Sequence, residues 1–503
     1  MPRTGIQTPG RGGSALAWGA ITVDRSLPTP LYRQVYDCVR GQILSGAWRP
    51  GDQIPSLRDV VRNQHLARNT VLNAYQQLCA EGYLENRQGA GFFVADVSFD
   101  ILRAPLEPAE HGGDEMGAGL SSPASTTAAQ EEAAASTEYR YDFSYGNLTA
   151  DAFPVNTWRK LCTEALYADD GKGLGRYFHS QGQLGLRLEI ARYLGQARGV
   201  QCAPEQIFLT TGVQQSLERL LLLFDPARDR FAMEEPGFPP VRQVVTDRGF
   251  DLASIPCDQG HRAYEEALRS SDARLIYATP SHQMPTGIHL GLEARLRLLE
   301  LAQQTDAYVL EDDYDSVFRF DAQPIPTLTA LDSTNRVIYL GTFSKLLAPA
   351  LRLGYVVIPR RLLPRAQEVL GPYRCGVSLL EQETLRLFMA GGHWDRHVRR
   401  MEHTIRARHA LLVDEIRRQM PATVTLQGAD AGLHLLLTVG NGMDQDQLCR
   451  TAAAAGVLVQ RTDRYWTDPA RAPLDTVMLA YSAIPGNRIA EGVHLLRTAW
   501  FGS

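Results

Sequence analysis

The sequence predicts an α/β protein in which a small, mainly helical domain precedes a large domain built on a mostly parallel sheet. Three observations support this fold class. The chain of 503 residues is longer than one hydrophobic core usually organises. From residue 139 onward, short apolar runs alternate with amphipathic stretches, which is typical of parallel strands covered on both faces. A stretch of small and polar residues separates that region from the first part of the chain.

The composition is that of an ordinary soluble protein. Hydrophobic residues make up 44% and charged residues 21% of the chain, and its net charge of −5 gives no overall signal for nucleic-acid binding. The seven cysteines show no CxxC pair and no metal-like spacing to histidine, so we expect reduced thiols, a cytoplasmic protein and no metal site. The apolar stretch 15–23 is too short to span a membrane, and no membrane partner is expected.

The chain is expected to divide into three segments. Residues 25–97 are compact and rich in motifs. Residues 98–138 are dominated by Ala, Ser, Glu, Pro and Gly, which bury too little apolar surface to offset the entropy of ordering, so this segment is predicted to be a flexible linker. Residues 139–503 form the large domain. Within it, strand-like runs are expected at 207–211, 231–234, 275–279, 307–312, 337–342 and 354–358, and a helix at 292–304.

The first domain has the pattern of three helices followed by a hairpin. Apolar residues recur every four positions from Leu31 to Ile43, which places them on one face of a helix. A second helix is expected to begin at Ser56, and a third to end at Gly82. Two strand-like runs then flank a turn that contains Gly89. This order predicts a winged helix-turn-helix whose third helix enters the major groove of DNA.

The same stretch, residues 31–94, resembles the GntR family of winged-helix regulators. The matching motifs are Pro50-Gly51-Asp52, Ile54-Pro55-Ser56-Leu57-Arg58, Arg68-Asn69-Thr70-Val71 and Glu81-Gly82-Tyr83-Leu84. The resemblance implies a double-stranded DNA operator as partner. The residues that it places on DNA are Arg58, Arg68, Asn69 and Thr70, with Arg87 and Gly89 in the wing.

Two features of this domain modify that expectation. Ala67 stands where the family usually has Ser, which removes a hydroxyl that caps the helix or reaches a phosphate. Residues 25–97 contain eight arginines and six acidic residues, a net charge of +2, so non-specific affinity for DNA should be modest.

The large domain contains a lysine in an unusual place. Lys345 closely follows the strand-like run 337–342, within the segment Gly341-Thr-Phe-Ser-Lys345. Burial at the end of a strand would lower the pKa of the lysine and favour the neutral amine that forms a Schiff base. Thr342, Ser344 and Arg352 are suited to bind a phosphate together. A Schiff-base lysine beside a phosphate site is therefore expected.

A carboxylate and a second anion site complete this pattern. Either Asp312 or Asp313, at the end of another predicted strand, can supply a carboxylate, and Tyr314 follows them. Residues 210–215 join a strand to a helix whose first backbone N–H groups favour an anion. Pyridoxal 5′-phosphate (PLP) needs a lysine, a phosphate site and a carboxylate that keeps its pyridine nitrogen protonated. The sequence therefore predicts PLP as the cofactor.

The large domain resembles PLP-dependent aminotransferases of fold type I, which have a mostly parallel sheet and a smaller C-terminal subdomain. With the GntR-like domain in front, the whole chain resembles the MocR-type regulators. The motifs that carry this resemblance are Thr279-Pro-Ser-His-Gln283, Pro285-Thr-Gly287, Glu311-Asp-Asp-Tyr-Asp-Ser316 and Gly341-Thr-Phe-Ser-Lys345.

The resemblance implies a role for each residue of the PLP site. Lys345 would carry PLP as a Schiff base, and Asp312 rather than Asp313 would bond the pyridine nitrogen. The other implied contacts are Tyr314 on the phenolic oxygen, Phe238 stacked on the ring, Gly212, Val213, Gln214, Thr342, Ser344 and Arg352 around the phosphate, and Tyr177 reaching across a homodimer to the neighbour's phosphate.

Two positions depart from the aminotransferase pattern. Met284 stands where aminotransferases usually carry an Asn whose amide bonds the phenolic oxygen of the cofactor. The stretch Met478-Leu-Ala-Tyr481 replaces a motif whose Arg binds the carboxylate of the substrate. Arg464 matches the position where some regulators of this type bind an effector carboxylate, and Arg461 is a close competitor.

Three functions follow as hypotheses. The first is a transcription regulator that binds DNA and uses PLP on Lys345 to sense a small amino compound. The alternative is a PLP-dependent aminotransferase with a working transamination cycle, which Met284 and Met478 disfavour. The third is a regulator of vitamin B6 supply for which PLP itself is the ligand. The first hypothesis is the prediction, with transamination at most a residual activity.

Overall fold

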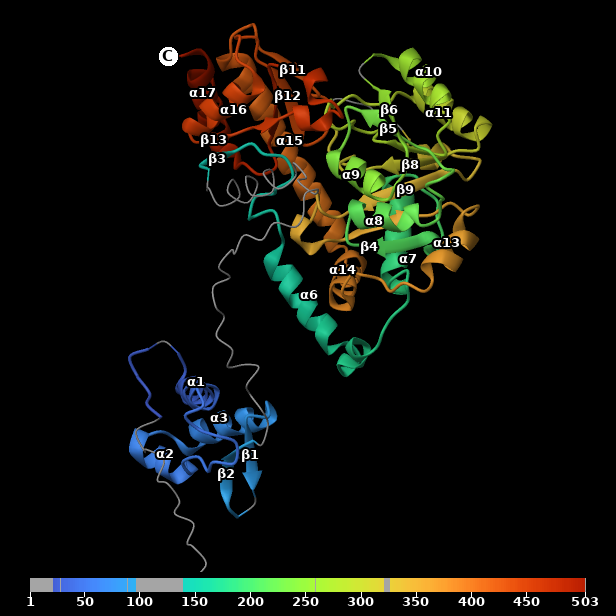
Figure 1. Cartoon of the computed structure of the whole chain (residues 1–503). Helices are drawn as coiled ribbons and strands as arrows, with labels where there is room; N and C mark the ends of the chain where they lie inside the picture. The colour runs from blue at the N-terminus through green and yellow to red at the C-terminus, as the bar shows by residue number, and fades with distance from the viewer. Residues whose placement is uncertain are drawn as a thin grey trace, which may run out of the picture. The chain divides into compact units, whose positions relative to one another are not determined.

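The computed structural model describes residues 21–27, 29–87, 89–95, 139–257, 259–320 and 326–502. The chain separates into two units, residues 1–123 and 124–503 (Figure 1). The linker expected at 98–138 lies outside the described residues. Among the described helices, none combines the length and the apolar character that crossing a bilayer requires.

The N-terminal unit contains the three predicted helices and the predicted hairpin. Ser56 caps the second helix, because its side chain accepts a hydrogen bond from Asp59 N. Ala67 precedes the third helix and offers no side-chain cap. Gly89 has a φ of 78°, the left-handed conformation that the turn of the hairpin requires. The elements are α1 (Leu31–Leu44), α2 (Leu57–Gln64), α3 (Arg68–Ala80), β1 (Leu84–Arg87) and β2 (Gly91–Val94).

A small apolar core holds α3 against α1 and the hairpin. Val35, Val39 and Ile43 are fully buried on α1, as the four-residue spacing predicts. Tyr75 of α3 packs edge-on against Phe92 of β2, and its hydroxyl donates to the carbonyl of Pro55 at 3.0 Å. Because burying each large apolar side chain stabilises the fold by about 1.5–3 kcal/mol, this core fixes the surface that α3 presents.

A seven-stranded sheet organises the large unit. Its neighbouring strands are parallel except where β10 pairs with β4 and β9, both antiparallel, so the prediction of a mostly parallel sheet is confirmed. All six predicted runs form strands, and β6 was missed because most of its side chains are not buried. In spatial order the strands are β4 (Ile207–Thr210), β10 (Gly354–Val357), β9 (Val337–Thr342), β8 (Tyr308–Asp312), β7 (Leu275–Ala278), β5 (Phe231–Glu235) and β6 (Leu252–Pro256).

Helices cover both faces of this sheet. Because successive residues of a strand point to opposite faces, Tyr277 and Leu310 join one core cluster while Ile276 and Val309 join another. The first cluster includes α8 (Val213–Leu221), α9 (Pro239–Asp247) and α13 (Leu363–Leu370). The second includes α10 (His261–Ser271), α11 (Leu292–Gln304) and α12 (Leu328–Leu331), and α11 coincides with the helix predicted there.

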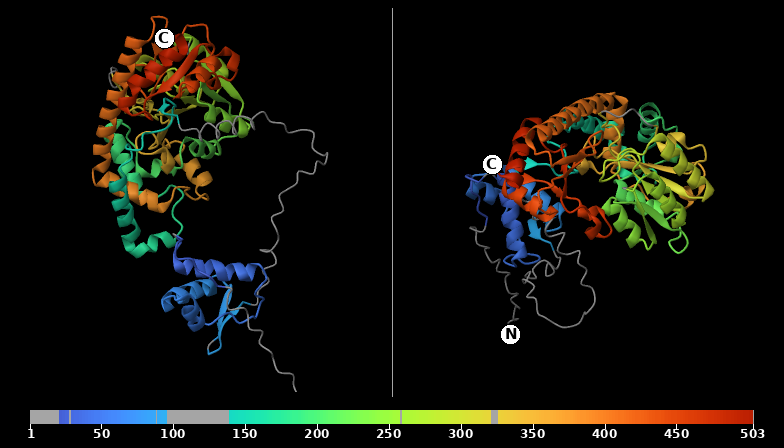
Figure 2. Two further views of the ribbon diagram at one scale, coloured as in Figure 1. Left: turned by 90° about the vertical axis from the view of Figure 1, so that its left-hand side faces the viewer. Right: turned by 90° about the horizontal axis from the view of Figure 1, so that it is seen from above.

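A smaller subdomain, also expected, contains most of the C-terminal elements, which gather at one end of the large unit (Figure 2). Its four-stranded sheet has the order β11 (Thr425–Gln427), β12 (His434–Thr438), β15 (Thr476–Ala480) and β14 (Gln460–Arg461), and β13 (Val457–Leu458) pairs with β3 (Tyr141–Asp142). The remaining long helices of the unit are α6 (Val155–Tyr167), α7 (Leu184–Ala197), α14 (Leu379–Ala390), α15 (His393–Gln419), α16 (Gln445–Ala454) and α17 (Gly486–Phe501).

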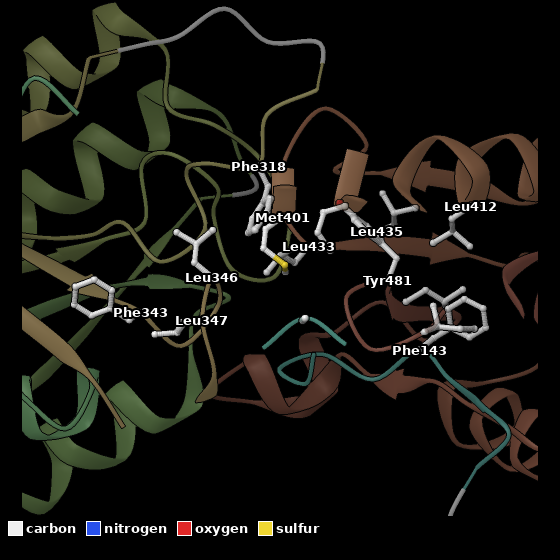
Figure 3. Close-up of a cluster of buried hydrophobic side chains, with 14 of the residues drawn as sticks. Phe143, Phe318, Phe343, Leu346, Leu347, Met401, Leu412, Leu433, Leu435 and Tyr481 are labelled. Atoms are coloured by element: carbon white, nitrogen blue, oxygen red, sulfur yellow. The ribbon is translucent and has the colours of Figure 1, made fainter. Parts of the chain in front are cut away.

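One apolar core joins the subdomain to the end of strand β9. Phe343, Leu346 and Leu347, which surround Lys345 in sequence, are buried in the same cluster as Met401 of α15 and Leu435 of β12 (Figure 3). The backbone on both sides of Lys345 is therefore held by packing, and the lysine side chain is the part of this segment that is left for chemistry.

Candidate cofactor site

A cavity opens where the parallel strands of the large sheet end. Its empty volume is about 800 Å³ with adjoining solvent included, which is the size of a small-molecule site. Ligands of open α/β sheets bind at this carboxyl edge because the loops that follow the strands converge there. The cavity is lined by Tyr145, Gly212, Val213, Gln214, Phe238, Pro240, Tyr277, Thr279, Met284, Asp312, Tyr314, Thr342, Ser344, Lys345, Pro349 and Arg352.

Lys345 is buried in this cavity. Its Nζ lies 4.2 Å from the centre of the Tyr145 ring. Burial lowers the pKa of Lys345 to about 8, although the negative charges of Asp315 and Asp312 act in the opposite direction. An amine with this pKa is partly neutral near pH 8, and the neutral form is the nucleophile that a carbonyl compound needs.

Two adjacent carboxyl groups at the end of β8 have different surroundings. Asp312 lines the cavity and accepts a hydrogen bond from the Tyr277 hydroxyl at 2.5 Å. Burial raises the pKa of Asp312 to about 7, although the hydrogen bond from Tyr277 acts to lower it. Asp313 lies outside the cavity lining, because Arg198 binds it at 2.8 and 2.9 Å and Tyr339 at 2.6 Å. The structure therefore brings Asp312, and not Asp313, to the site.

One end of the cavity has the groups that an anion requires. Gly212 precedes the first turn of α8, and a Cβ at this position would lie 3.0 Å from Nη2 of Arg352. Glycine therefore allows the guanidinium to approach the helix start, where backbone N–H groups favour negative charge. Arg352 itself has a φ of 51°, a left-handed conformation that costs a non-glycine residue energy and that often marks functional sites. Thr342 and Ser344 add hydroxyl groups to the same lining.

A different part of the lining, called the Met284 wall below, is formed by Tyr314, Phe238 and Met284. The Tyr314 hydroxyl donates to the carbonyl of His282 at 2.9 Å and lies 3.8 Å from Sδ of Met284. Phe238 lies at the start of α9 and packs against the cluster that contains Met284 and Met478. One cavity thus contains a buried lysine, a buried carboxyl group and an anion-binding end. These groups fit PLP, which needs a lysine for its Schiff base, a carboxylate for its pyridine nitrogen and a site for its phosphate.

Two predicted site residues do not line this cavity within one chain. Tyr177 is 91% exposed, and its ring lies 5.9 Å from the guanidinium carbon of Arg374. Arg464 lies on an exposed turn, and the cavity lining does not include it. Its competitor Arg461 is held by Asp463 and, at 3.1 Å, by Asp446.

Sequence reasoning missed two tyrosines of the site. Tyr145 contacts the amine of Lys345, and Tyr277 donates to Asp312. Neither residue belongs to a motif that the sequence analysis used. Tyr277 does stand two residues before the motif at Thr279, at the cavity end of its strand, and that position was an available signal.

The residues predicted to contact DNA lie on the surface of the N-terminal unit. Arg58, Arg68, Asn69, Arg87 and Gly89 are exposed and Thr70 is half-buried. Within the described residues, Arg58 and Arg68 form no ion pair, whereas Arg87 pairs with Glu85 at 3.4 Å. The starts of α2 and α3 therefore present two arginines whose charges are not compensated by a close acidic partner.

Comparisons with known proteins find a matching family for each of the two units. Residues 31–94 match the family "Bacterial regulatory proteins, gntR family", and residues 141–468 match "Aminotransferase class I and II". The structure of the α-aminoadipate aminotransferase LysN from Thermus thermophilus, complexed with N-(5′-phosphopyridoxyl)-L-leucine, is similar with a TM-score of 0.65 and 25% identity, over 72% of this chain and 92% of that one. The chain thus combines a GntR-type winged helix-turn-helix with an aminotransferase-like domain of fold type I.

Relatives that share both units specify the family. The chain is 34% identical to the probable rhizopine catabolism regulatory protein MocR of Rhizobium meliloti, over 95% of this chain and 96% of that protein. It is 33% identical to the uncharacterized HTH-type transcriptional regulator YdeL of Bacillus subtilis, over 95% and 98%. The chain belongs to this family of MocR-type, HTH-type transcriptional regulators.

Proposed function

We propose that this protein is a cytoplasmic transcription regulator that binds PLP on Lys345 through a Schiff base and uses it to sense a small amino compound. The observation that carries this proposal is the cavity in which Lys345, Asp312 and Arg352 converge, in a chain that also contains a winged helix-turn-helix. When bound, PLP supplies an aldehyde carbon that exchanges one amine for another. An amino compound would thereby compete with Lys345 and change the state of the large domain.

Each residue of the cavity has a proposed task. Lys345 would anchor the cofactor, and Asp312 would hold the proton of its pyridine nitrogen. Phe238 would cover one face of the ring, and Tyr314 would donate to the phenolic oxygen. The phosphate would be held by Gly212, Val213, Gln214, Thr342, Ser344 and Arg352, all of which line the cavity.

The walls of the cavity favour sensing over turnover. Met284 offers a thioether where an aminotransferase has an amide, and Met478 is buried beside it with Tyr465 and Trp466 in one apolar cluster. Among the described residues that line the cavity, the positively charged side chains are Lys345 and Arg352, and neither belongs to this cluster. We propose that Arg464, which lies next to Tyr465 on the surface turn, contacts the effector carboxylate.

The proposal includes a homodimer. Large apolar side chains are exposed along α6, the following turn and the start of α7. A gathering of exposed apolar groups usually marks a protein interface. Tyr177 lies within this stretch and would reach the phosphate in the neighbouring subunit. The exposed side chains are Val155, Leu166, Tyr167, Leu174, Tyr177, Leu184 and Leu188.

The N-terminal unit, residues 25–97, is proposed to read the operator, and residues 98–138 to link it to the large domain at 139–503. Arg58, Arg68, Asn69 and Thr70 would contact bases or phosphates, while Arg87 and Gly89 would contact the backbone from the wing. Replacing Arg68 by Ala should lower operator affinity about 10-fold and leave the cofactor spectrum unchanged, because one such contact is worth about 1–3 kcal/mol. Arg62→Ala is the matched control, since Arg62 pairs with Asp59 on the same unit. Binding that Arg68→Ala leaves undiminished would exclude this role.

The first experiment is a titration of the purified, PLP-loaded protein with a panel of amino acids and other amines, followed by visible absorbance and by DNA binding. A sensor should give a stable spectral change with one amine, together with altered DNA affinity. Conversion of the cofactor to its pyridoxamine form, reversed by a keto acid, would instead establish a working aminotransferase. A change of DNA affinity with PLP alone would establish a vitamin B6 regulator.

A further inference from the structure

A buried polar cluster lies behind the Met284 wall of the cavity, and the proposed function does not use it. Nδ1 of His282 lies 2.8 Å from Oδ2 of Asp315, and each of these side chains is only 1% exposed. The Tyr314 hydroxyl lies 3.1 Å from the same Nδ1. Because Tyr314 lines the cavity, the three side chains form a continuous chain of polar contacts from Asp315 to the site.

Asp315 determines which ring nitrogen of His282 carries the proton. A carboxylate only accepts hydrogen bonds, so Nδ1 of a neutral His282 must be the donor and Nε2 must keep a lone pair. Nε2 is buried and has no hydrogen-bond partner among the described residues. Buried polar atoms are nearly always satisfied, so an orphaned nitrogen is a cost that stability alone does not explain. The placement of the ring is instead explained by its contacts at Nδ1.

These contacts make Tyr314 a hydrogen-bond donor. Burial, followed by the negative charge of Asp315, raises the pKa of Tyr314 well above its usual value, so the phenol keeps its proton. The one Nδ1–H of His282 is shared between Asp315 and the Tyr314 oxygen, where it occupies a lone pair, so the Tyr314 hydroxyl acts as the donor. That hydroxyl donates to the carbonyl of His282 at 2.9 Å, and it would turn from this carbonyl to donate to the phenolic oxygen of PLP. Another hydroxyl of the cavity lining, that of Thr279, donates to Glu234 at 2.7 Å.

The neighbouring charges leave this arrangement intact. The ring of His434 lies 4.8 Å from that of His282, and its Nε2 lies 2.9 Å from the carbonyl of Pro285. Burial, followed by the proximity of His282 and Lys345, lowers the pKa of His434 well below its usual value, so His434 adds no positive charge. Asp312 and Lys345 are the remaining charged groups that face the cluster from the cavity.

We propose that His282 and Asp315 are positioning residues, which orient the Tyr314 hydroxyl as a donor to the phenolic oxygen of PLP and thereby replace the amide that Met284 does not provide. This inference rests on the proposed function and deepens it, because it concerns how the same site is tuned. The pair acts through Tyr314 and does not itself line the cavity.

The test measures the pH midpoint of the visible absorption band in the full-length, PLP-loaded protein. Tyr314→Phe removes a donor from an oxygen that carries negative charge, which makes the cofactor more basic. Its midpoint should rise by about one pH unit or more. His282→Gln and Asp315→Asn should raise the midpoint by about half as much. In a protein that already carries Tyr314→Phe, His282→Gln should cause no further rise of the pH midpoint, because its effect requires the Tyr314 hydroxyl.

A matched control separates positioning from packing. His409 is a buried histidine that stacks on Phe320 with ring centres 4.0 Å apart, outside this cluster. His409→Gln should lower the melting temperature and leave the midpoint unchanged. If Asp315→Asn does not fold, His282→Gln and His282→Asn carry the test.

The outcomes distinguish this inference from the proposed function. An equal shift from His282→Gln with and without the Tyr314 hydroxyl would overturn the positioning role, and so would an unchanged midpoint in both single variants. A wild-type protein that shows no visible band with PLP would overturn the proposed function and this inference with it. A normal band that the variants do not move would overturn the inference alone.

Discussion

The two ends of the Lys345 cavity use different chemistry. At one end Gly212, Ser344 and Arg352 present backbone and side-chain donors for an anion. At the other end Met284 and Trp466 belong to an apolar cluster. The first end is suited to hold a phosphate, whereas the second end is largely apolar apart from the Tyr314 hydroxyl. This difference predicts that the residues that would retain a cofactor are separate from those that would act on a substrate, and mutations can test the two groups one by one.

The largest effect is expected from Lys345→Ala. This change removes the amine between the two ends and should abolish the visible band of covalently bound PLP completely. The anion end remains, so the variant should still bind PLP reversibly, as equilibrium dialysis would detect. Lys345→Arg keeps the charge without a usable amine and should behave in the same way. Retention of a covalent adduct after either change would place the Schiff base on another lysine.

The next largest effect is a pH dependence caused by Asp312. Burial raises its folded-state pKa from 3.8 to about 7, so the folded chain binds this proton more tightly than the unfolded chain. Stability without cofactor should therefore fall as the pH rises from about 4 to about 7, by at most about 4 kcal/mol. Asp312→Asn should remove this contribution, and thermal melting of both proteins across that range measures it. Parallel melting curves would show that the pKa of Asp312 is not raised.

A smaller effect is expected from Arg352→Ala. Loss of a hydrogen bond between charged groups costs about 1.5–3 kcal/mol, which corresponds to an affinity for PLP that is weaker by about 10- to 160-fold. Met284→Leu is the matched change at the opposite end and should alter PLP affinity less than 2-fold, because this change conserves volume and removes no polar partner of the phosphate. Equal losses from both changes would contradict the division of the cavity into two ends.

The smallest effect should come from Arg464→Ala. An exposed arginine contributes about 1 kcal/mol or less to a contact with a carboxylate, so the effector response should weaken about 5-fold while PLP stays bound. Arg461→Ala is the control, since Arg461 is already paired with Asp446 and Asp463. Spectral titration with the effector found in the first screen measures both variants. A response that only Arg461→Ala weakens would reverse the assignment.

Local patterns in the sequence predicted the fold well. The hydroxyl of Ser56, the turn at Gly89 and the apolar runs before Asp312 and Thr342 each specify structure within a few residues, and the structure confirms them. Strand β6 was missed because most of its side chains are not buried, so its sequence lacks the continuous apolar run of the central strands.

The site was predictable only in part. The motifs brought Lys345 and Asp312 to one cavity as expected. Tyr145 and the His282–Asp315 pair were not foreseen, because their contacts join segments far apart in the chain and depend on how loops fold back over the sheet. A contact between two single residues of different segments produces no periodic pattern in the sequence.

The packing around Lys345 limits which parts of the site can move. Leu346 and Leu347 are buried in the core that joins the subdomain to the large sheet, and His397 of α15 lies 2.6 Å from the carbonyl of Leu346. Under the proposed function, an amine that displaced Lys345 would free its four-carbon side chain, while the backbone would stay held by this packing. Any movement caused by ligand binding would therefore have to begin with the Lys345 side chain or with the Met284 wall, because the backbone beside Lys345 is packed in the core.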